Sequence, residues 1–180
     1  MKTTGEIKDL LQKKELDSTL LDIYLDESRL DYQRQRYIDA LAKYEELYGA
    51  GEVSIFSAPG RSEIGGNHTD HQHGEVLAAS INLDAIAITA PVDEPVVRVV
   101  SDGYDMITVS LDDLAVKEEL KGTTDSLIRG VLEGIQKHGG KIGGFRAYIT
   151  SDVLIGAGLS SSAAFETIIG TIISGIYYDM

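Results

Sequence analysis

Hydrophobic residues recur at helical spacing in the first fifty residues of the chain. They predict one or two short helices within residues 4–25 and a longer helix over residues 28–47, ended by Gly49. The apolar face of the longer helix consists of Tyr32, Tyr37, Ala40, Leu41, Tyr44 and Leu47. We therefore expect residues 1–50 to form a helical N-terminal extension and residues 51–180 to form the main domain.

From residue 52 the pattern changes to that of β-strands. Residues 52–58 alternate as a strand that Pro59-Gly60 is expected to end. Two further β-like segments, 76–81 and 85–89, indicate long or bent neighbouring strands. Segments 96–101 and 106–111 predict a hairpin around Asp102-Gly103, and residues 145–153 predict another strand.

Two helices interrupt and follow these strands. Residues 112–124 form a charged connection to an amphipathic helix at residues 125–138, which Gly139-Gly140 stops. An apolar helix follows at residues 163–178. Six of its apolar side chains are expected to leave bare surface, which predicts self-association through this helix: Phe165, Ile168, Ile169, Ile172, Ile173 and Ile176.

Composition limits the classes of function. The 180 residues are 43% hydrophobic, which is enough for a core of ordinary size, and they include no cysteine for disulfide or thiolate chemistry. No segment resembles a signal peptide or a transmembrane helix, so we expect a soluble, cytoplasmic protein. The net charge of −13 argues against binding to nucleic acid or to a membrane.

A glycine- and serine-rich stretch links the last strand to the last helix. Gly156 and Gly158 allow the backbone to approach a ligand closely, and the serines at 160–162 can cap the helix. No Lys or Arg follows Arg146, so a phosphate here would be held by backbone N–H groups at the helix N-terminus. The stretch is neither a P-loop nor a dinucleotide fingerprint. An ordinary strand-turn-helix with a serine cap is the alternative.

A second unusual stretch, residues 58–74, contains three of the four histidines. His68, Asp70, His71 and His73 are residue types that bind zinc, although they lie too close in sequence to converge easily. A solvated turn is also possible. We favour a site for a sugar and a phosphate, because Asp and His bind hydroxyls and Arg61 can stabilise a transferring phosphoryl group. Between residues 51 and 115 the only basic residues are Arg61 and Arg98.

Both stretches resemble motifs of one family, the GHMP small-molecule kinases. Residues 156–163, Gly-Ala-Gly-Leu-Ser-Ser-Ser-Ala, are similar to the family's second motif, with Leu154 where a proline usually stands. Residues 60–74 are similar to the galactokinase signature Gly-Arg-x-Asn-Leu-Ile-Gly-Glu-His-Thr-Asp-Tyr-x-x-Gly. In that signature Glu63 replaces an asparagine, Asn67 a glutamate and His71 a tyrosine.

The resemblance implies an α+β fold, in which a mixed β-sheet has helices packed on one face. It also implies phosphoryl transfer from ATP, with Mg²⁺, to the anomeric hydroxyl of galactose or a related sugar. Arg61 would be catalytic, and Asn67, His68 and Asp70 would bind the substrate. The ATP phosphates would be held by Gly156, Ala157, Gly158, Leu159, Ser160, Ser161, Ser162 and Ala163, with Ser161 and Ser162 assisting the metal.

The resemblance covers the chain from about residue 53 but only about the front half of a galactokinase. The family's catalytic aspartate follows the helix that begins at the serine stretch. We therefore expect this chain to be a fragment that is inactive by itself. A non-catalytic sensor of sugar or nucleotide with the same fold, and a metal-binding protein that uses the histidines, are the competing hypotheses.

Overall fold

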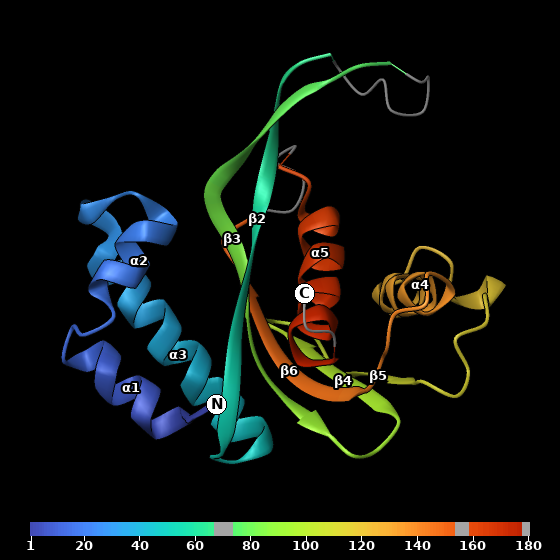
Figure 1. Ribbon diagram of the computed structural model, residues 1–180, viewed down its shortest axis with the longest axis horizontal. Helices are drawn as coiled ribbons and strands as arrows, with labels where there is room; N and C mark the ends of the chain where they lie inside the picture. Colours follow the sequence, from blue (N-terminus) through green and yellow to red (C-terminus); the bar gives the residue numbers. More distant parts are fainter. Residues whose placement is uncertain (67–73, 154–158, 178–180) are drawn as a thin grey trace.

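The computed structural model describes residues 1–66, 74–153 and 159–177. Within them lies a six-stranded sheet with the order β1-β2-β3-β6-β4-β5 (Figure 1). The strands are β1 (Lys2–Thr3), β2 (Glu52–Gly65), β3 (Leu77–Val92), β4 (Val96–Ser101), β5 (Ile107–Ser110) and β6 (Gly144–Ser151). The pairing of β4 with β6 is parallel, whereas the other strand pairs are antiparallel, so the sheet is mixed.

Three N-terminal helices pack against one face of the sheet (Figure 1). They are α1 (Thr4–Gln12), α2 (Asp17–Tyr24) and α3 (Leu30–Tyr48), with a 3₁₀ turn at Glu27–Arg29 before α3. Thr3 and Glu6 form a capping box that starts α1. The buried apolar residues of these helices meet Ile86, Ile88 and Tyr148 of the sheet, and this burial of apolar side chains holds the extension in place.

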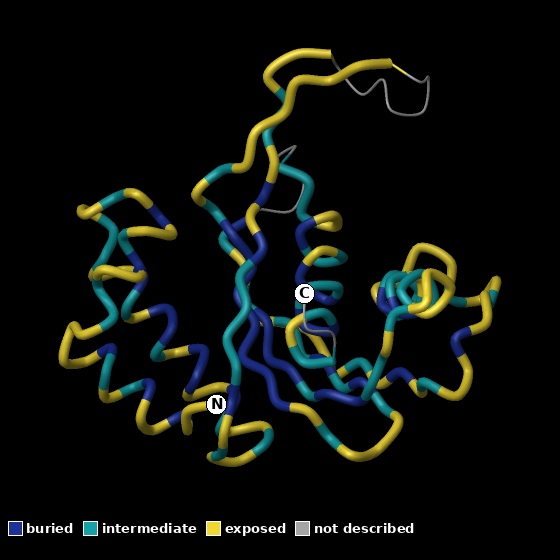
Figure 2. Tube along the Cα trace, viewed as in Figure 1, coloured by how far each residue is buried: buried dark blue, intermediate teal, exposed yellow. Residues whose placement is uncertain are grey.

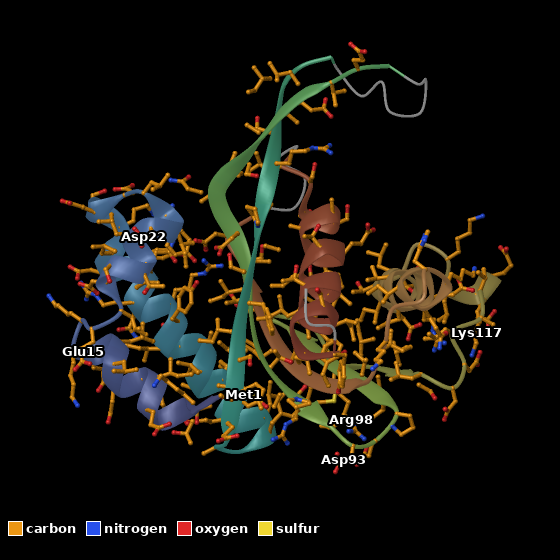
Figure 3. All side chains as sticks on the ribbon, in the orientation of Figure 1. Met1, Glu15, Asp22, Asp93, Arg98 and Lys117 are labelled. Atoms are coloured by element: carbon orange, nitrogen blue, oxygen red, sulfur yellow. The ribbon has the colours of Figure 1, made fainter. Side chains whose placement is uncertain are left out.

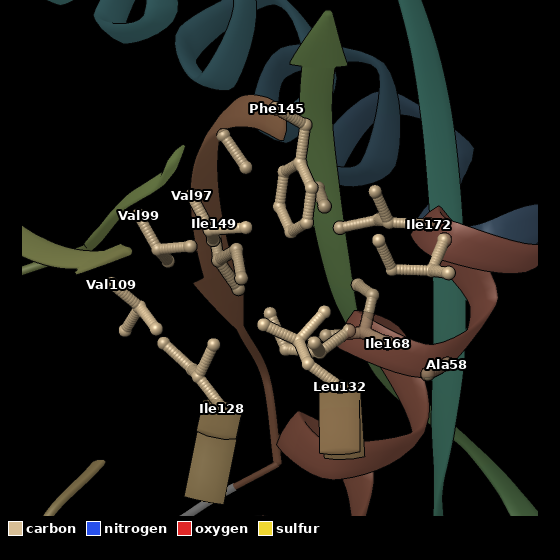
Figure 4. Close-up of a cluster of buried hydrophobic side chains, with 14 of the residues drawn as sticks. Ala58, Val97, Val99, Val109, Ile128, Leu132, Phe145, Ile149, Ile168 and Ile172 are labelled. Carbon is tan, nitrogen blue, oxygen red and sulfur yellow. The ribbon is translucent and has the colours of Figure 1, made fainter. Parts of the chain in front are cut away.

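The opposite face of the sheet is covered by α4 (Thr124–Lys137) and α5 (Ser161–Tyr177). A 3₁₀ turn at Glu118–Leu120 precedes α4. Ile128 and Leu132 of α4 and Ile168 of α5 point into a cluster with side chains of β4, β5 and β6 (Figure 4). Successive residues of a strand point to opposite faces, so β3 contributes to both cores. This explains why residues 84–90 are buried without interruption.

The architecture confirms the predicted α+β fold with a mixed sheet. Within residues 51–180 the helices lie on one face, as expected. The helical extension covers the second face, an arrangement that the sequence pattern did not predict. The short strand β1, in which Lys2 pairs with Val53, was also not predicted.

The prediction that Pro59-Gly60 ends the strand was wrong, because β2 continues to Gly65. The ladder with β3 shifts register between Pro59 and Arg61 and then resumes. The two β-like segments expected at 76–81 and 85–89 are likewise one strand, β3. β6 pairs with β3 only from Ala85 onward, so the distal halves of β2 and β3 form a two-stranded arm. Figure 2 shows that this arm is largely exposed.

The surface of α5 differs from the sequence-based expectation. Ile168, Ile169, Ile172 and Ile173 are completely buried against the sheet, so they leave no bare apolar surface. The premise for self-association through these four side chains is therefore wrong. Phe165 and Ile176 are half-buried and pack on the same core.

Candidate functional site

Arg61 lies on β2 at the base of the exposed arm, opposite Ser80 of β3. Its side chain is 48% exposed, and its Nη2 atom lies 3.3 Å from Oε1 of Glu63. Both side chains are on β2 two residues apart, so they project from the same face of the strand. Arg61 is thus accessible to a ligand, with a carboxylate beside it.

The backbone of Arg61 joins β2 to the segment that begins α5. The Arg61 N–H donates a hydrogen bond to the carbonyl oxygen of Leu159, at 3.2 Å. Gly60 makes this approach possible, because a Cβ atom at that position would lie 3.1 Å from each of three neighbours: Leu159 O, Val153 Cγ1 and Ile81 Cδ1. The glycine predicted to end a strand therefore brings the two motifs together.

The start of α5 follows directly from Leu159. Ser160 has φ of 58°, in the left-handed region that non-glycine residues seldom adopt. Its carbonyl oxygen accepts a hydrogen bond from Ala164 N–H, the first bond of the helical ladder. The N–H groups of Ser161, Ser162 and Ala163 precede that bond, and Ser162 and Ala163 are exposed. Such a helix end favours an anionic ligand.

Several predicted site residues lie outside the described part of the chain. They are Asn67, His68, Asp70, Gly156, Ala157 and Gly158, together with the candidate zinc ligands His71 and His73. Of the predicted phosphate-binding set, Leu159 and the serines at 160–162 are described, as is Ala163. The structure therefore brings Arg61 to Leu159 and Ser160, and the remaining assignments stay predictions.

Gly66 is the last described residue before the three histidines of residues 58–74, which are His68, His71 and His73. It has φ of 108°, and a Cβ atom there would lie 2.6 Å from Glu75 O and 2.8 Å from Val76 Cα. Glycine is therefore required where the arm brings its two strands together. The described residues on either side of the three histidines are held side by side by this contact and by the pairing of Gly65 with Leu77.

The residues present at the start of α5 are compatible with a magnesium-phosphate ligand. Ser161 and Ser162 carry hydroxyl oxygens, the donor type that Mg²⁺ accepts alongside phosphate oxygens. Within residues 1–66, 74–153 and 159–177, no group of three or more His, Asp or Glu side chains is placed to hold a metal ion alone. The hydroxyls would thus assist a metal that is carried mainly by phosphates.

A buried polar network beneath the site was not anticipated from the sequence. The Asp84 carboxylate, 4% exposed, accepts hydrogen bonds from Arg36 Nη1 at 2.6 Å, Tyr24 OH at 2.9 Å and Ser57 Oγ at 2.5 Å. Burial alone would lower the pKa of Arg36, but the charge of Asp84 and their hydrogen bond raise it above its usual value. The network ties α2 and α3 to β2 and β3. A sequence signal existed, since Asp84 is a lone carboxylate beside a long apolar run.

The phenols of this network are kept neutral. Tyr24 OH and Tyr37 OH lie 2.9 Å apart. Burial, with a smaller contribution from the charge of Asp84, raises the pKa of Tyr37 to about 12. Burial also raises the pKa of Tyr24. Both side chains therefore act as structural hydrogen-bonding groups near neutral pH.

No helix in the described part of the chain is long and apolar enough to span a membrane.

Two family models match the chain. Residues 42–91 match the galactokinase galactose-binding signature, and residues 126–179 match the N-terminal domain of GHMP kinases. The first match includes Arg61 and the arm, and the second includes most of α4 together with β6 and α5.

Solved structures share the fold. Galactokinase from Lactococcus lactis, solved in complex with galactose, is 26% identical with a TM-score of 0.69, over 77% of this chain and 36% of that chain. Mevalonate kinase from Methanococcus jannaschii is 17% identical with a TM-score of 0.58, over 72% of this chain and 42% of that chain. At that identity the mevalonate kinase shows the fold alone.

The chain thus spans well under half the length of these enzymes. The two family matches cover the segments that contain Arg61 and Leu159, and the structure joins these segments in one mixed sheet with its helices. Together they identify the chain as a member of the GHMP kinase family that carries the galactokinase galactose-binding signature.

Proposed function

We propose that the protein is a galactokinase-type sugar kinase, which transfers the γ-phosphoryl group of ATP to the anomeric hydroxyl of galactose or a related sugar. One observation carries the proposal. The Arg61 N–H donates a hydrogen bond to Leu159 O, and this contact between the two motifs supports a single site that contains both. The similarity to a galactokinase solved with galactose supports the choice of sugar.

The residues of this chain would supply binding and electrostatic stabilisation. Backbone N–H groups at the start of α5 would hold the phosphates of ATP, with Gly156, Ala157 and Gly158 as further members of this site. The Arg61 guanidinium would neutralise charge that develops as the phosphoryl group moves to the sugar oxygen. Mg²⁺, assisted by Ser161 and Ser162, would screen the phosphate charges. Asn67, His68 and Asp70 would bind the sugar hydroxyls.

Glu63 gives this site a feature of its own. Its carboxylate neutralises part of the Arg61 charge. A phosphoryl group arriving beside Arg61 would have to compete with Glu63 for the guanidinium. We therefore expect Arg61 to change partners, from Glu63 to the phosphoryl oxygens, when both substrates are bound.

The test is a phosphorylation assay on the complete protein with ATP, Mg²⁺ and a panel of sugars. The panel contains galactose, N-acetylgalactosamine, arabinose and glucose, because Asn67 replaces the glutamate of the signature. We expect a sugar 1-phosphate from galactose or a close relative. If no member of the panel is phosphorylated, the kinase proposal is wrong.

A second candidate is a sensor that binds the same sugar and nucleotide without catalysis. The pairing of Arg61 with Glu63 favours this candidate, because a carboxylate beside the guanidinium weakens its action on a phosphoryl group. Calorimetry separates the two functions. Binding of sugar and ATP without turnover would favour the sensor.

For either function we propose a cytoplasmic location.

A further inference from the structure

Asp152 is the residue through which the N-terminal helices contact the segment before the predicted phosphate-binding stretch. Its Oδ1 atom accepts a hydrogen bond from Tyr32 OH of α3 at 2.7 Å. Its Oδ2 atom lies 3.6 Å from Arg29 Nη2, and Oδ1 lies 3.5 Å from Arg36 Nε. The Asp152 side chain is only 15% exposed. Three side chains of the extension thus lie against one carboxylate, and Tyr32 supplies the hydrogen bond.

The backbone around Asp152 is fixed as well. Its N–H donates a hydrogen bond to the carbonyl oxygen of Asp84, at 2.9 Å. Arg36 Nη2 donates to that same carbonyl, at 2.8 Å. The next N–H, of Val153, donates to Ser151 Oγ at 3.1 Å. Side chain and backbone therefore fix the same short segment in relation to α3 and β3.

Val153 connects this segment to the candidate site. It is 3% exposed, and its Cγ1 atom lies 3.1 Å from where a Cβ of Gly60 would stand. Further along the chain, Leu159, the first described member of the predicted phosphate-binding stretch 156–163, accepts the hydrogen bond from Arg61 N–H at its carbonyl oxygen. Described residues on both sides of 154–158 are thus anchored, Asp152 by the extension and Leu159 by β2.

We propose that Tyr32 and Asp152 are positioning residues for nucleotide binding, and that the N-terminal helices set the point from which the phosphate-binding stretch begins. The inference rests on the proposed function, since it assumes that this stretch binds ATP. The N-terminal helices would then affect the affinity for ATP through Asp152. Preorganised backbone N–H groups bind an anion more tightly than groups that must first be ordered.

Tyr32→Phe is the sharpest test. It removes one hydroxyl and keeps the ring, over which the Arg29 guanidinium lies at 4.8 Å. Tyr104→Phe is the matched control, because that tyrosine is 63% exposed and lies in the β4–β5 connection rather than in the N-terminal helices. Hydrogen exchange without ligand, followed in peptides that cover residues 150–153, reports on the anchor. Calorimetry with Mg·ATP reports on the site.

We expect Tyr32→Phe to accelerate exchange in residues 150–153 and to raise the Kd for ATP roughly three- to tenfold, which is less than the full effect of one lost charge-assisted hydrogen bond because Tyr32 acts on the site only through Asp152. Tyr104→Phe should change neither quantity. Accelerated exchange with an unchanged Kd would mean that the anchor is merely structural and would overturn the inference. Unchanged hydrogen exchange in residues 150–153 would also overturn the inference, because Tyr32 would then not anchor this segment.

Asp152→Asn provides a second, independent variant. If Tyr32 acts through Asp152, the double variant should bind ATP about as weakly as Asp152→Asn alone, and additive losses would contradict the coupling. Wild-type protein that binds no ATP would instead disprove the proposed function. In that case the exchange data still show whether Tyr32 holds the segment, so the two failures are distinguishable.

Discussion

Arg61 and Leu159 belong to different motifs, and a hydrogen bond between their backbones holds them together at 3.2 Å. The contact depends on the absence of a side chain at Gly60, which packs against Leu159 O, Val153 and Ile81. The site is therefore assembled by close backbone packing between β2 and the start of α5. The charged side chains of Arg61 and Glu63 project from this backbone framework.

Gly60→Ala should lower both stability and ATP affinity. The added methyl group meets backbone as well as side-chain atoms at 3.1 Å, so the segment at Leu159 must shift. Overpacking of this kind costs about 1–3 kcal/mol of unfolding free energy. Urea denaturation and calorimetry with ATP measure the two effects. Gly130→Ala is the control, since nothing lies within 4 Å of that Cβ position in α4 and alanine favours a helix. If the two variants had the same unfolding free energy and the same affinity for ATP, the packing argument would be wrong.

Arg61→Ala should reduce kcat about a hundredfold and leave the KM for sugar nearly unchanged, because the guanidinium acts on charge that develops in the transition state. Steady-state kinetics of sugar phosphorylation measure both quantities. Arg98→Ala is the matched control, because Arg98 lies at the end of the sheet away from the arm and pairs with the exposed Glu94 (Figure 3). A near-normal kcat for Arg61→Ala would refute the catalytic assignment.

Arg36→Met should destabilise the protein by about 3–5 kcal/mol, because it leaves the buried Asp84 carboxylate without its cation. Chemical denaturation followed by circular dichroism measures the change. The control is Lys43→Met, which removes an exposed pair with Glu46 on the same helix and should have no measurable effect. If both variants unfold at the same denaturant concentration, the network does not anchor the extension.

Stability should fall in alkaline solution. The pKa of Tyr37 is about 12 in the folded protein because the side chain is buried, whereas an unfolded tyrosine ionises near pH 10. Its contribution to stability is complete below pH 10 and is lost as pH rises from there toward 12, with a slope approaching about 1.4 kcal/mol per pH unit. Denaturation across this range measures the slope. Tyr37→Phe should make it shallower, and Tyr104→Phe should not.

Periodicity predicted the helices and most strands because each buries a regular apolar stripe. It failed at Pro59-Gly60, which does not form a turn. There the ladder between β2 and β3 only shifts register, and Gly60 serves the close contact with Leu159. It also did not reveal that the extension covers the second face of the sheet. That placement combines burial of apolar side chains with the pairing of Arg36 and Asp84, which are contacts between distant residues that no local pattern reports. The sequence revealed the two motifs of the candidate site. The contact between them, from Arg61 N–H to Leu159 O, could be seen only in the structure.

The position of β6 has a consequence for biosynthesis. This strand separates β3 from β4 in the sheet, yet it follows both in the chain. While a ribosome makes the protein, the β2–β3 and β4–β5 hairpins emerge first, each with an unpaired edge that β6 later covers. Such edges attract other strands. We therefore expect the nascent chain to depend on chaperones until Gly144–Ser151 has left the exit tunnel, and to become resistant to aggregation abruptly at that length.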